Sequence, residues 1–277
     1  MIKTKELTKH FGQIKAVDTL NLHIKQGEIF GLLGPNGAGK TTTVRMLNTL
    51  TLPTSGMAEI NGLDVVREAN KVKQIIGVCP QELNLDRELT ACENLRIHGL
   101  LYRMQAIEER ITELLEWCGL SSRAHNLLNT FSGGMQRRLL VTRSIMHRPK
   151  VLFLDEPTVG LDPQVRRQIW NLIRDLKRQG VTILLTTHYI EEAELLCQRV
   201  GILSYGKLIA LGTPEELKSK VGHFVVESID DGVTNYRLFD SREEAYKFAE
   251  ERTDDVLIRE SNLEDVFIKL TGERIEK

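Results

Sequence analysis

The strongest constraint on the fold is a run of small residues that ends in a lysine and a threonine. It begins at Gly34 and reads GPNGAGKT, ending with Lys40 and Thr41. An apolar run rich in β-forming residues (28–33) precedes it, and a helix-patterned segment (41–50) follows. Glycines in such a turn let backbone N–H groups at the helix N-terminus surround anionic oxygens. The sequence therefore predicts a phosphate-binding P-loop within an α/β fold, rather than a glycine-rich turn with a chance lysine.

The P-loop predicts a nucleoside triphosphate as the ligand. Lys40 supplies a positive charge to the phosphates, and the Thr41 hydroxyl is expected to bind Mg²⁺. The residues expected to contact the nucleotide here are Gly34, Pro35, Asn36, Gly37, Ala38, Gly39, Lys40, Thr41 and Thr42.

A second apolar run, 151–154, ends in two carboxylates. Asp155 is expected to hold or orient the hydrated metal ion, and Glu156 is the candidate general base for an attacking water. A strand that ends in acidic residues is by itself more often a surface cap. Together with the upstream P-loop, it predicts a nucleoside triphosphatase.

The coarse pattern predicts a mostly parallel sheet covered by helices. Helix-patterned stretches separate the strand-like runs, including a third run at 182–186. Segments 2–24 and 58–61 are expected to form an antiparallel β subdomain beside this core, and about 88–130 an α-helical subdomain.

The last part of the chain has a different composition. We expect residues 1–220 to form the nucleoside triphosphatase domain and 221–277 a small C-terminal α/β accessory domain. Helix starts are predicted by Asp162-Pro163 and by two capping boxes, one from Thr213 to Glu216 and one from Ser261 to Glu264. Regulation, dimer contact and simple stabilisation all stay open as roles for the tail.

Composition limits the partners. With 37 Lys+Arg against 38 Asp+Glu the net charge is −1, so no global basic field recruits nucleic acid or anionic lipid. The start lacks the apolar core of a signal peptide, and no apolar run is long enough for direct membrane insertion. A cytoplasmic location is expected, with any membrane attachment made through a partner. The cysteines are expected to be reduced structural thiols: Cys79, Cys92, Cys118 and Cys197.

A second small-residue turn narrows the class. Phe131-Ser132-Gly133-Gly134-Met135-Gln136 runs into a helix, and its hydroxyl, backbone donors and helix dipole suit a γ-phosphate. It resembles the signature of the ABC transporter ATPases. That resemblance implies that Ser132, Gly133 and Gly134 contact the ATP of an opposite subunit, so that a homodimer encloses two ATP molecules.

Further positions match the same family in the same order along the chain. Phe11 lies at the position of the aromatic that stacks on adenine, Gln81 at the Q-loop, and Asp162 in the D-loop. His188 matches the switch histidine that senses the γ-phosphate. The resemblance makes Gln81 both a catalytic residue and a metal ligand. Taken singly, Phe11 would more often be a core residue, and His188 a structural histidine.

Three strings indicate the subtype. FSGGM at 131–135, DEPTVGLDP at 155–163 and LEDVFIKLTG at 263–272 resemble ATPases of drug, lipid and polysaccharide exporters with separately encoded permeases. The resemblance implies an export motor on the inner face of the cell membrane, with the permease docking near residues 81–95. An importer ATPase is one alternative. A soluble ABC ATPase that remodels nucleic acid or ribosomes is another, although such proteins usually carry a long coiled coil or two cassettes. The cargo is not specified by the sequence.

Overall fold

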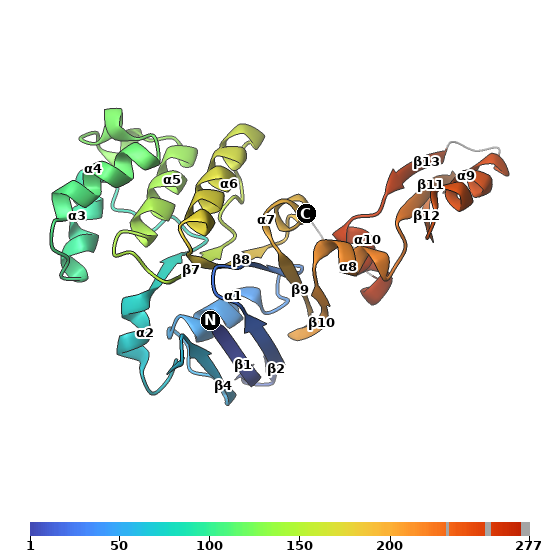
Figure 1. Ribbon diagram of the computed structural model, residues 1–277, viewed down its shortest axis with the longest axis horizontal. Coiled ribbons are helices and arrows are strands. Elements are labelled where there is room, and N and C mark those ends of the chain that lie inside the picture. The colour runs from blue at the N-terminus through green and yellow to red at the C-terminus, as the bar shows by residue number, and fades with distance from the viewer. Residues whose placement is uncertain (231–232, 253–255, 273–277) are drawn as a thin grey trace.

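The central element is a six-stranded sheet with the order β10-β9-β3-β8-β7-β6. The computed structural model describes residues 1–230, 233–252 and 256–272 (Figure 1). The strands are β3 (Ile29–Leu33), β6 (Ile76–Cys79), β7 (Val151–Asp155), β8 (Thr182–Thr187), β9 (Arg199–Ser204) and β10 (Lys207–Gly212). All neighbouring pairs are parallel except β9 with β10. The prediction of a mostly parallel core is confirmed.

An antiparallel sheet lies beside this core, as expected. Its order is β2-β1-β4-β5, from β1 (Ile2–Phe11), β2 (Ile14–Ile24), β4 (Ser55–Ile60) and β5 (Leu63–Asp64). Its inner side chains share a buried cluster with helix α1 (Lys40–Leu47) and with Phe30 and Phe153 of the central sheet. Helix α2 (Ala69–Ile75) leads from β5 to β6.

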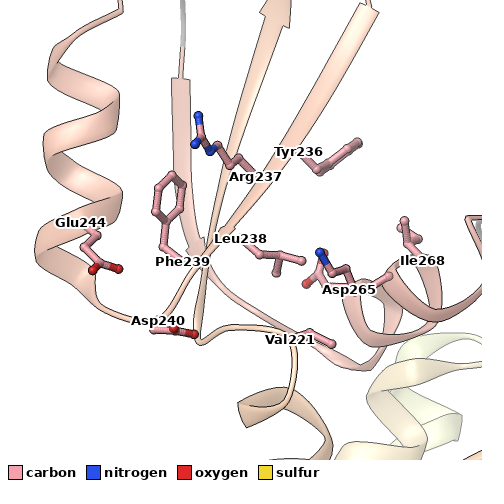
Figure 2. Close-up of a pocket in the computed structure, with 10 residues that line it drawn as sticks. Val221, Tyr236, Arg237, Leu238, Phe239, Asp240, Glu244, Asp265 and Ile268 are labelled. Atoms are coloured by element: carbon pink, nitrogen blue, oxygen red, sulfur yellow. The ribbon is translucent and has the colours of Figure 1, made fainter.

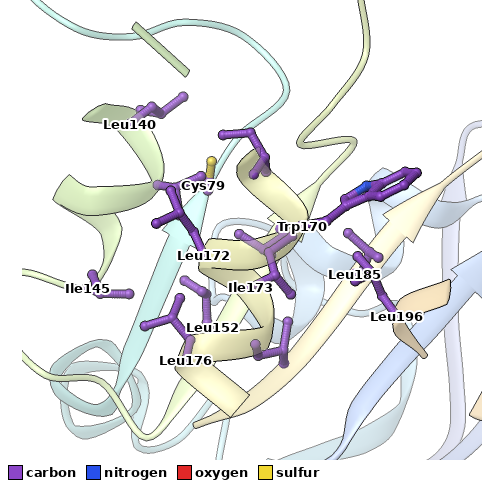
Figure 3. Close-up of a cluster of buried hydrophobic side chains, with 14 of the residues drawn as sticks. Cys79, Leu140, Ile145, Leu152, Trp170, Leu172, Ile173, Leu176, Leu185 and Leu196 are labelled. Carbon is purple, nitrogen blue, oxygen red and sulfur yellow. The ribbon is translucent and has the colours of Figure 1, made fainter. Parts of the chain in front are cut away.

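The other face of the central sheet is covered mainly by α5 (Gly133–Ser144), α6 (Pro163–Arg178) and α7 (Ile190–Leu196). Apolar residues recur along α6 at helical spacing, and Figure 3 shows Trp170, Ile173 and Leu176 packed above the strands. Asp162 caps α6, with Pro163 at its first position, as predicted. Burying each such large side chain stabilises the fold by about 1.5–3 kcal/mol.

The predicted helical subdomain is also present. It contains α3 (Ala91–Leu101), α4 (Ile107–Trp117) and two short 3₁₀ turns, Ser121–Arg123 and Leu128–Thr130, beside α5. A capping box between Thr90 and Glu93 opens α3.

The C-terminal elements from strand β11 to strand β13 form an arm that projects away from the central sheet (Figure 1). Strands β11 (Phe224–Asp230), β12 (Val233–Phe239) and β13 (Val256–Glu260) form an antiparallel sheet in the order β12-β11-β13, which contacts α9 (Arg242–Glu250). An open pocket of about 660 Å³ lies between this sheet and α10 (Leu263–Thr271), and Figure 2 shows side chains that line it. Helix α10 itself packs on α7 and on α8 (Pro214–Ser219), with Leu263, Val266 and Phe267 in the main core. The division at residue 220 stays a prediction.

One predicted cap is wrong. The capping box of α10 is formed by Asn262 and Asp265, not by Ser261 and Glu264. The Asn262 side chain accepts hydrogen bonds from the backbone of Glu264 and Asp265, whereas the Ser261 hydroxyl donates to the Gly222 carbonyl. The Ser261 hydroxyl therefore serves a contact between segments far apart in the sequence. The box from Thr213 to Glu216 is confirmed.

The four cysteines are free and buried, as expected for structural thiols. Among the residues described, no helix combines the length and apolar character that crossing a bilayer requires.

The helical subdomain contains a half-buried histidine that should make stability depend on pH. Burial lowers the pKa of His98 to about 4, with smaller contributions from the positive charges of Arg143 and His147. The folded protein thus favours neutral His98. The resulting contribution to the free energy of unfolding is fully present above pH 6.5 and is lost as the pH falls towards 4. We expect His98→Phe, which keeps an aromatic ring beside Tyr102, to lose less thermal stability than wild type over that interval. Melting curves at several pH values measure this, with exposed His125→Phe as the control. Equal acid sensitivity of wild type and His98→Phe would contradict it.

Candidate active site

The P-loop joins β3 to α1, and its geometry depends on Gly39. Gly39 has a φ of 102°, and a Cβ there would lie 2.3 Å from the Ala16 carbonyl oxygen, so any side chain would clash. Helix α1 begins at the next residue, Lys40, and its first backbone N–H groups therefore border the loop. The buried Lys40 ammonium donates to the carbonyl oxygens of Gly34 at 2.7 Å and Pro35 at 3.0 Å.

Lys40 also forms a buried ion pair with Glu156, with Nζ 3.4 Å from Oε1. Burial lowers the pKa of the Lys40 ammonium, and the negative charge of Glu156 opposes this change. The cluster thus places the Lys40 ammonium where it would attract an anion bound in the P-loop. The structure brings this pair together from positions more than a hundred residues apart in the sequence.

Asp155 and Thr41 lie next to each other, as a shared metal site requires. The Thr41 hydroxyl donates to Asp155 Oδ1 at 3.2 Å, and the Thr186 hydroxyl donates to the same oxygen. Asp155 is buried, so these hydroxyls fix the orientation of its carboxylate. Hydroxyl and carboxylate oxygens are ligands that Mg²⁺ prefers. The donor set therefore fits this metal ion.

Glu156 is at the centre of the predicted catalytic residues. Its φ of 48° places a non-glycine residue in the left-handed region, at a cost of about 1–3 kcal/mol. The Glu156 N–H is held by the backbone oxygen and the hydroxyl of Thr186, both at 3.1 Å. Its Oε2 lies 3.1 Å from His188 Nδ1 and 3.5 Å from Gln81 Nε2. The carboxylate therefore contacts three of the predicted functional groups: Lys40, Gln81 and His188.

Arg137 holds the backbone at Gln81, a contact that no local sequence pattern indicated. Its buried guanidinium donates to the carbonyl oxygens of Pro80 at 3.0 Å and Gln81 at 2.7 Å. Arg137 lies on α5, the helix that begins after Ser132. The signature turn and the Q-loop are therefore joined through one side chain.

The signature turn lies apart from the P-loop cluster. The Ser132 hydroxyl caps α5 by accepting from Met135 N–H at 3.3 Å. A Cβ on Gly134 would lie 2.6 Å from a methyl group of Val165, so the turn packs closely on the start of α6. Around Gly133, in contrast, no atom lies within 4 Å of an added Cβ. In the part of the chain that the structure describes, no hydrogen bond joins Ser132 to Lys40 or Glu156.

Two further predicted contacts lie on the surface. Asp162 is exposed and caps α6, accepting from Val165 N–H at 2.9 Å, and its contact with ATP stays a prediction. Phe11 ends β1 with 51% of its surface exposed, which rules out the core alternative. The Lys9 ammonium lies 5.0 Å from its ring centroid. One face of this ring thus contacts a cation, while much of the residue is free for a ligand.

Comparison with known proteins agrees with this arrangement. The family model described as "ABC transporter" matches residues 17–159. A Nod factor export ATP-binding protein I of Cupriavidus metallidurans is 42% identical, over 98% of this chain and 97% of its own. A daunorubicin/doxorubicin resistance ATP-binding protein of Streptomyces peucetius is 40% identical, over 98% of this chain and 92% of its own.

Solved structures show the same fold. A dimeric ATP-binding cassette in a post-hydrolysis state, bound to ADP and phosphate, is similar with a TM-score of 0.70 and 30% identity. The similarity covers 77% of this chain and 98% of that one. An ATP-binding subunit of an ABC transporter gives a TM-score of 0.72 at 28% identity, over 79% of this chain and 92% of that one.

The fold and the site define an ATP-binding P-loop ATPase. The chain belongs to the ABC transporter ATP-binding family, as its resemblance indicated. It is an ATP-hydrolysing subunit, and its similarity to export and resistance ATPases favours an exporter over the importer alternative.

Proposed function

We propose that two copies of this chain close around two ATP molecules and drive export through a separate membrane permease at the cytoplasmic face of the membrane. The observation that carries this proposal is the separation of two phosphate-binding elements. Lys40, Asp155 and Glu156 form one cluster, whereas the Ser132 turn lies outside it with Gly133 uncovered. Each chain thus supplies a P-loop cluster and a signature turn. In this proposal the P-loop cluster of one chain and the signature turn of the other form one complete site.

The residues of the P-loop cluster have distinct roles in this proposal. The P-loop N–H groups and Lys40 bind the triphosphate, and Phe11 stacks on the adenine. Thr41 and Asp155 would hold Mg²⁺, with Gln81 as a further ligand, and the bound ion would neutralise phosphate charge. Glu156 accepts a proton from the attacking water, and His188 orients Glu156 and approaches the γ-phosphate.

The second chain supplies the remaining contacts. Ser132 and the backbone of Gly133 and Gly134 lie at the N-terminus of α5, where partial positive charge favours an anion. We place this turn over the γ-phosphate bound by the opposite P-loop. Asp162, capping the neighbouring helix α6, belongs to the same contact.

An exposed groove on the helical subdomain is the proposed docking surface for the permease. It has a volume of about 180 Å³ and lies where α3 approaches the segment after the Q-loop. Its lining residues are Asn84, Asp86, Leu89, Asn94, Ile97, His98, Leu101 and Arg143. Leu101 is 74% exposed and Leu100 is 60% exposed, which suits burial against an apolar partner segment. The groove overlaps the docking region expected at residues 81–95 and extends it along α3.

Glu156→Gln tests the assignment of the general base. The amide keeps the size of the side chain and its contacts with Gln81 and His188, but it accepts a proton poorly. We expect the ATP dissociation constant to stay within about threefold of wild type and turnover to fall at least about a hundredfold. Steady-state phosphate release and equilibrium nucleotide binding measure the two quantities. Near-normal turnover by a folded Glu156→Gln protein would remove Glu156 from this role.

Ser132→Arg tests the composite site. The turn is exposed, so the variant should fold and bind ATP through its own P-loop, but the bulky cation should block dimerisation around the partner's nucleotide. Light scattering with ATP, in a Glu156→Gln background that slows hydrolysis, reports the dimer. Ser121→Arg, an exposed serine on the helical subdomain, is the matched control. Full ATPase activity of Ser132→Arg as a strict monomer would defeat the two-chain model.

Leu101→Arg tests the docking surface. Placing a charge at an apolar contact should reduce co-purification with the permease at least about tenfold, because burying the charge costs several kcal/mol. Leu257→Arg, at a leucine 58% exposed on the C-terminal arm, is the control. Circular dichroism confirms that both variants fold. Equal recovery of the permease with Leu101→Arg and wild type would show that α3 is not the docking surface.

A further inference from the structure

Helix α7 carries a buried carboxylate that the roles assigned above do not use. Glu192 is 0% exposed and lies four residues after His188. Burial raises the pKa of its carboxyl, and the nearby Thr187 hydroxyl and hydrogen bonds from Trp170 and Thr158 oppose this rise. A buried acid held by several donors from separate segments fixes those segments relative to one another.

The geometry of these donors is specific. A single oxygen, Glu192 Oε1, accepts from the Thr158 hydroxyl at 2.8 Å and from the Trp170 indole N–H at 2.9 Å. Thr158 is fully buried and lies two residues after Glu156, in the loop between β7 and α6. Trp170 lies on α6, and Figure 3 shows its ring directed towards the side of the core where Leu185 and Leu196 lie.

The loop that follows Glu156 needs a hydrogen bond that holds it against α7. The Glu156 backbone is in the left-handed region, and its N–H is held from one side by Thr186. Thr158 is the next polar side chain in this loop, and its hydroxyl is bonded to α7. Because α7 begins two residues after His188, the same carboxylate restrains the segments that carry Glu156 and His188.

We propose that Glu192 is a positioning residue that keeps the Glu156 loop in register with the His188 segment, so that the 3.1 Å contact between Glu156 and His188 is maintained. The proposal rests on the role of Glu156 proposed above. Glu192 does not touch the nucleotide. It acts through Thr158, and its loss should therefore affect turnover more than ATP binding, which depends on the P-loop.

Two matched substitutions separate this role from general stability. Thr158→Val removes the hydroxyl in the loop after Glu156, and Trp170→Phe removes the indole N–H on α6. Each variant thus lacks one of the two hydrogen bonds that Glu192 Oε1 accepts. We expect Thr158→Val to lower kcat about tenfold with the ATP dissociation constant within about twofold of wild type. We expect Trp170→Phe to lower the melting temperature by at least as much as Thr158→Val, with a kcat within about threefold of wild type.

Variants of Glu192 itself supply a rescue test. Gln keeps an oxygen that can accept both hydrogen bonds, so Glu192→Gln should retain turnover within about threefold of wild type. Leu keeps similar bulk without an acceptor, so Glu192→Leu should show the kcat loss of Thr158→Val. If Glu192→Leu fails to fold, Thr158→Val and Glu192→Gln still decide the question.

The outcomes separate this inference from the proposed function when Glu156→Gln is measured in parallel. Loss of turnover in Glu156→Gln, with normal kcat in Thr158→Val, overturns the positioning role alone. Losses of kcat that simply follow the melting temperature in Thr158→Val and Trp170→Phe also overturn it, because they indicate stability only. Normal turnover in Glu156→Gln overturns both the assigned base and its positioning residue.

Discussion

The site depends on the parallel register of three adjacent strands. Leu33 at the end of β3 pairs with Thr187 of β8, and Asp155 at the end of β7 pairs with Thr186. The three strands thus end at the same level, and the segments that follow them emerge along one edge. The side chains of these strands are buried, with helices on one face and the antiparallel sheet and α1 on the other. A shift of the register would therefore expose buried side chains. The P-loop, the two carboxylates and His188 meet because of this pairing.

At that edge, electrostatics link the groups into one unit. The Lys40–Glu156 pair is buried, and removing two charges from water is costly unless hydrogen bonds compensate. The carbonyl oxygens of the P-loop, His188 and Gln81 provide that compensation. A triphosphate in the P-loop would compete with Glu156 for Lys40. Glu156 would then keep His188 as its close partner, which is the arrangement suited to orienting water.

Sequence patterns predicted the parts of the site that lie within a few residues of a strand end. Lys40, Asp155 and Glu156 could be placed because a buried apolar run precedes each motif. The donors to Glu192 could not, since Thr158 and Trp170 are 34 and 22 residues away and no local pattern joins them. The cap of α10 was misassigned because two overlapping boxes fit the local sequence, and only the contact of Ser261 with Gly222 separates them. Strands β9 and β10 were not predicted, although the capping box at Thr213 directly follows β10.

Helix α7 joins the active site to the C-terminal arm. Residues two positions apart on a helix point to different sides, and α7 uses this property with Glu192 and Glu194. Glu192 is buried and accepts a hydrogen bond from Thr158. Glu194 Oε1 accepts from the backbone N–H of Leu263, the first residue of α10, at 2.9 Å, so a side chain of α7 helps to cap α10. Leu263 and Phe267 are buried in the same core as α7. A displacement of the segment after His188 would therefore strain the Glu156 loop and the base of the arm together, although the arm's sheet lies far from the P-loop in the fold (Figure 1).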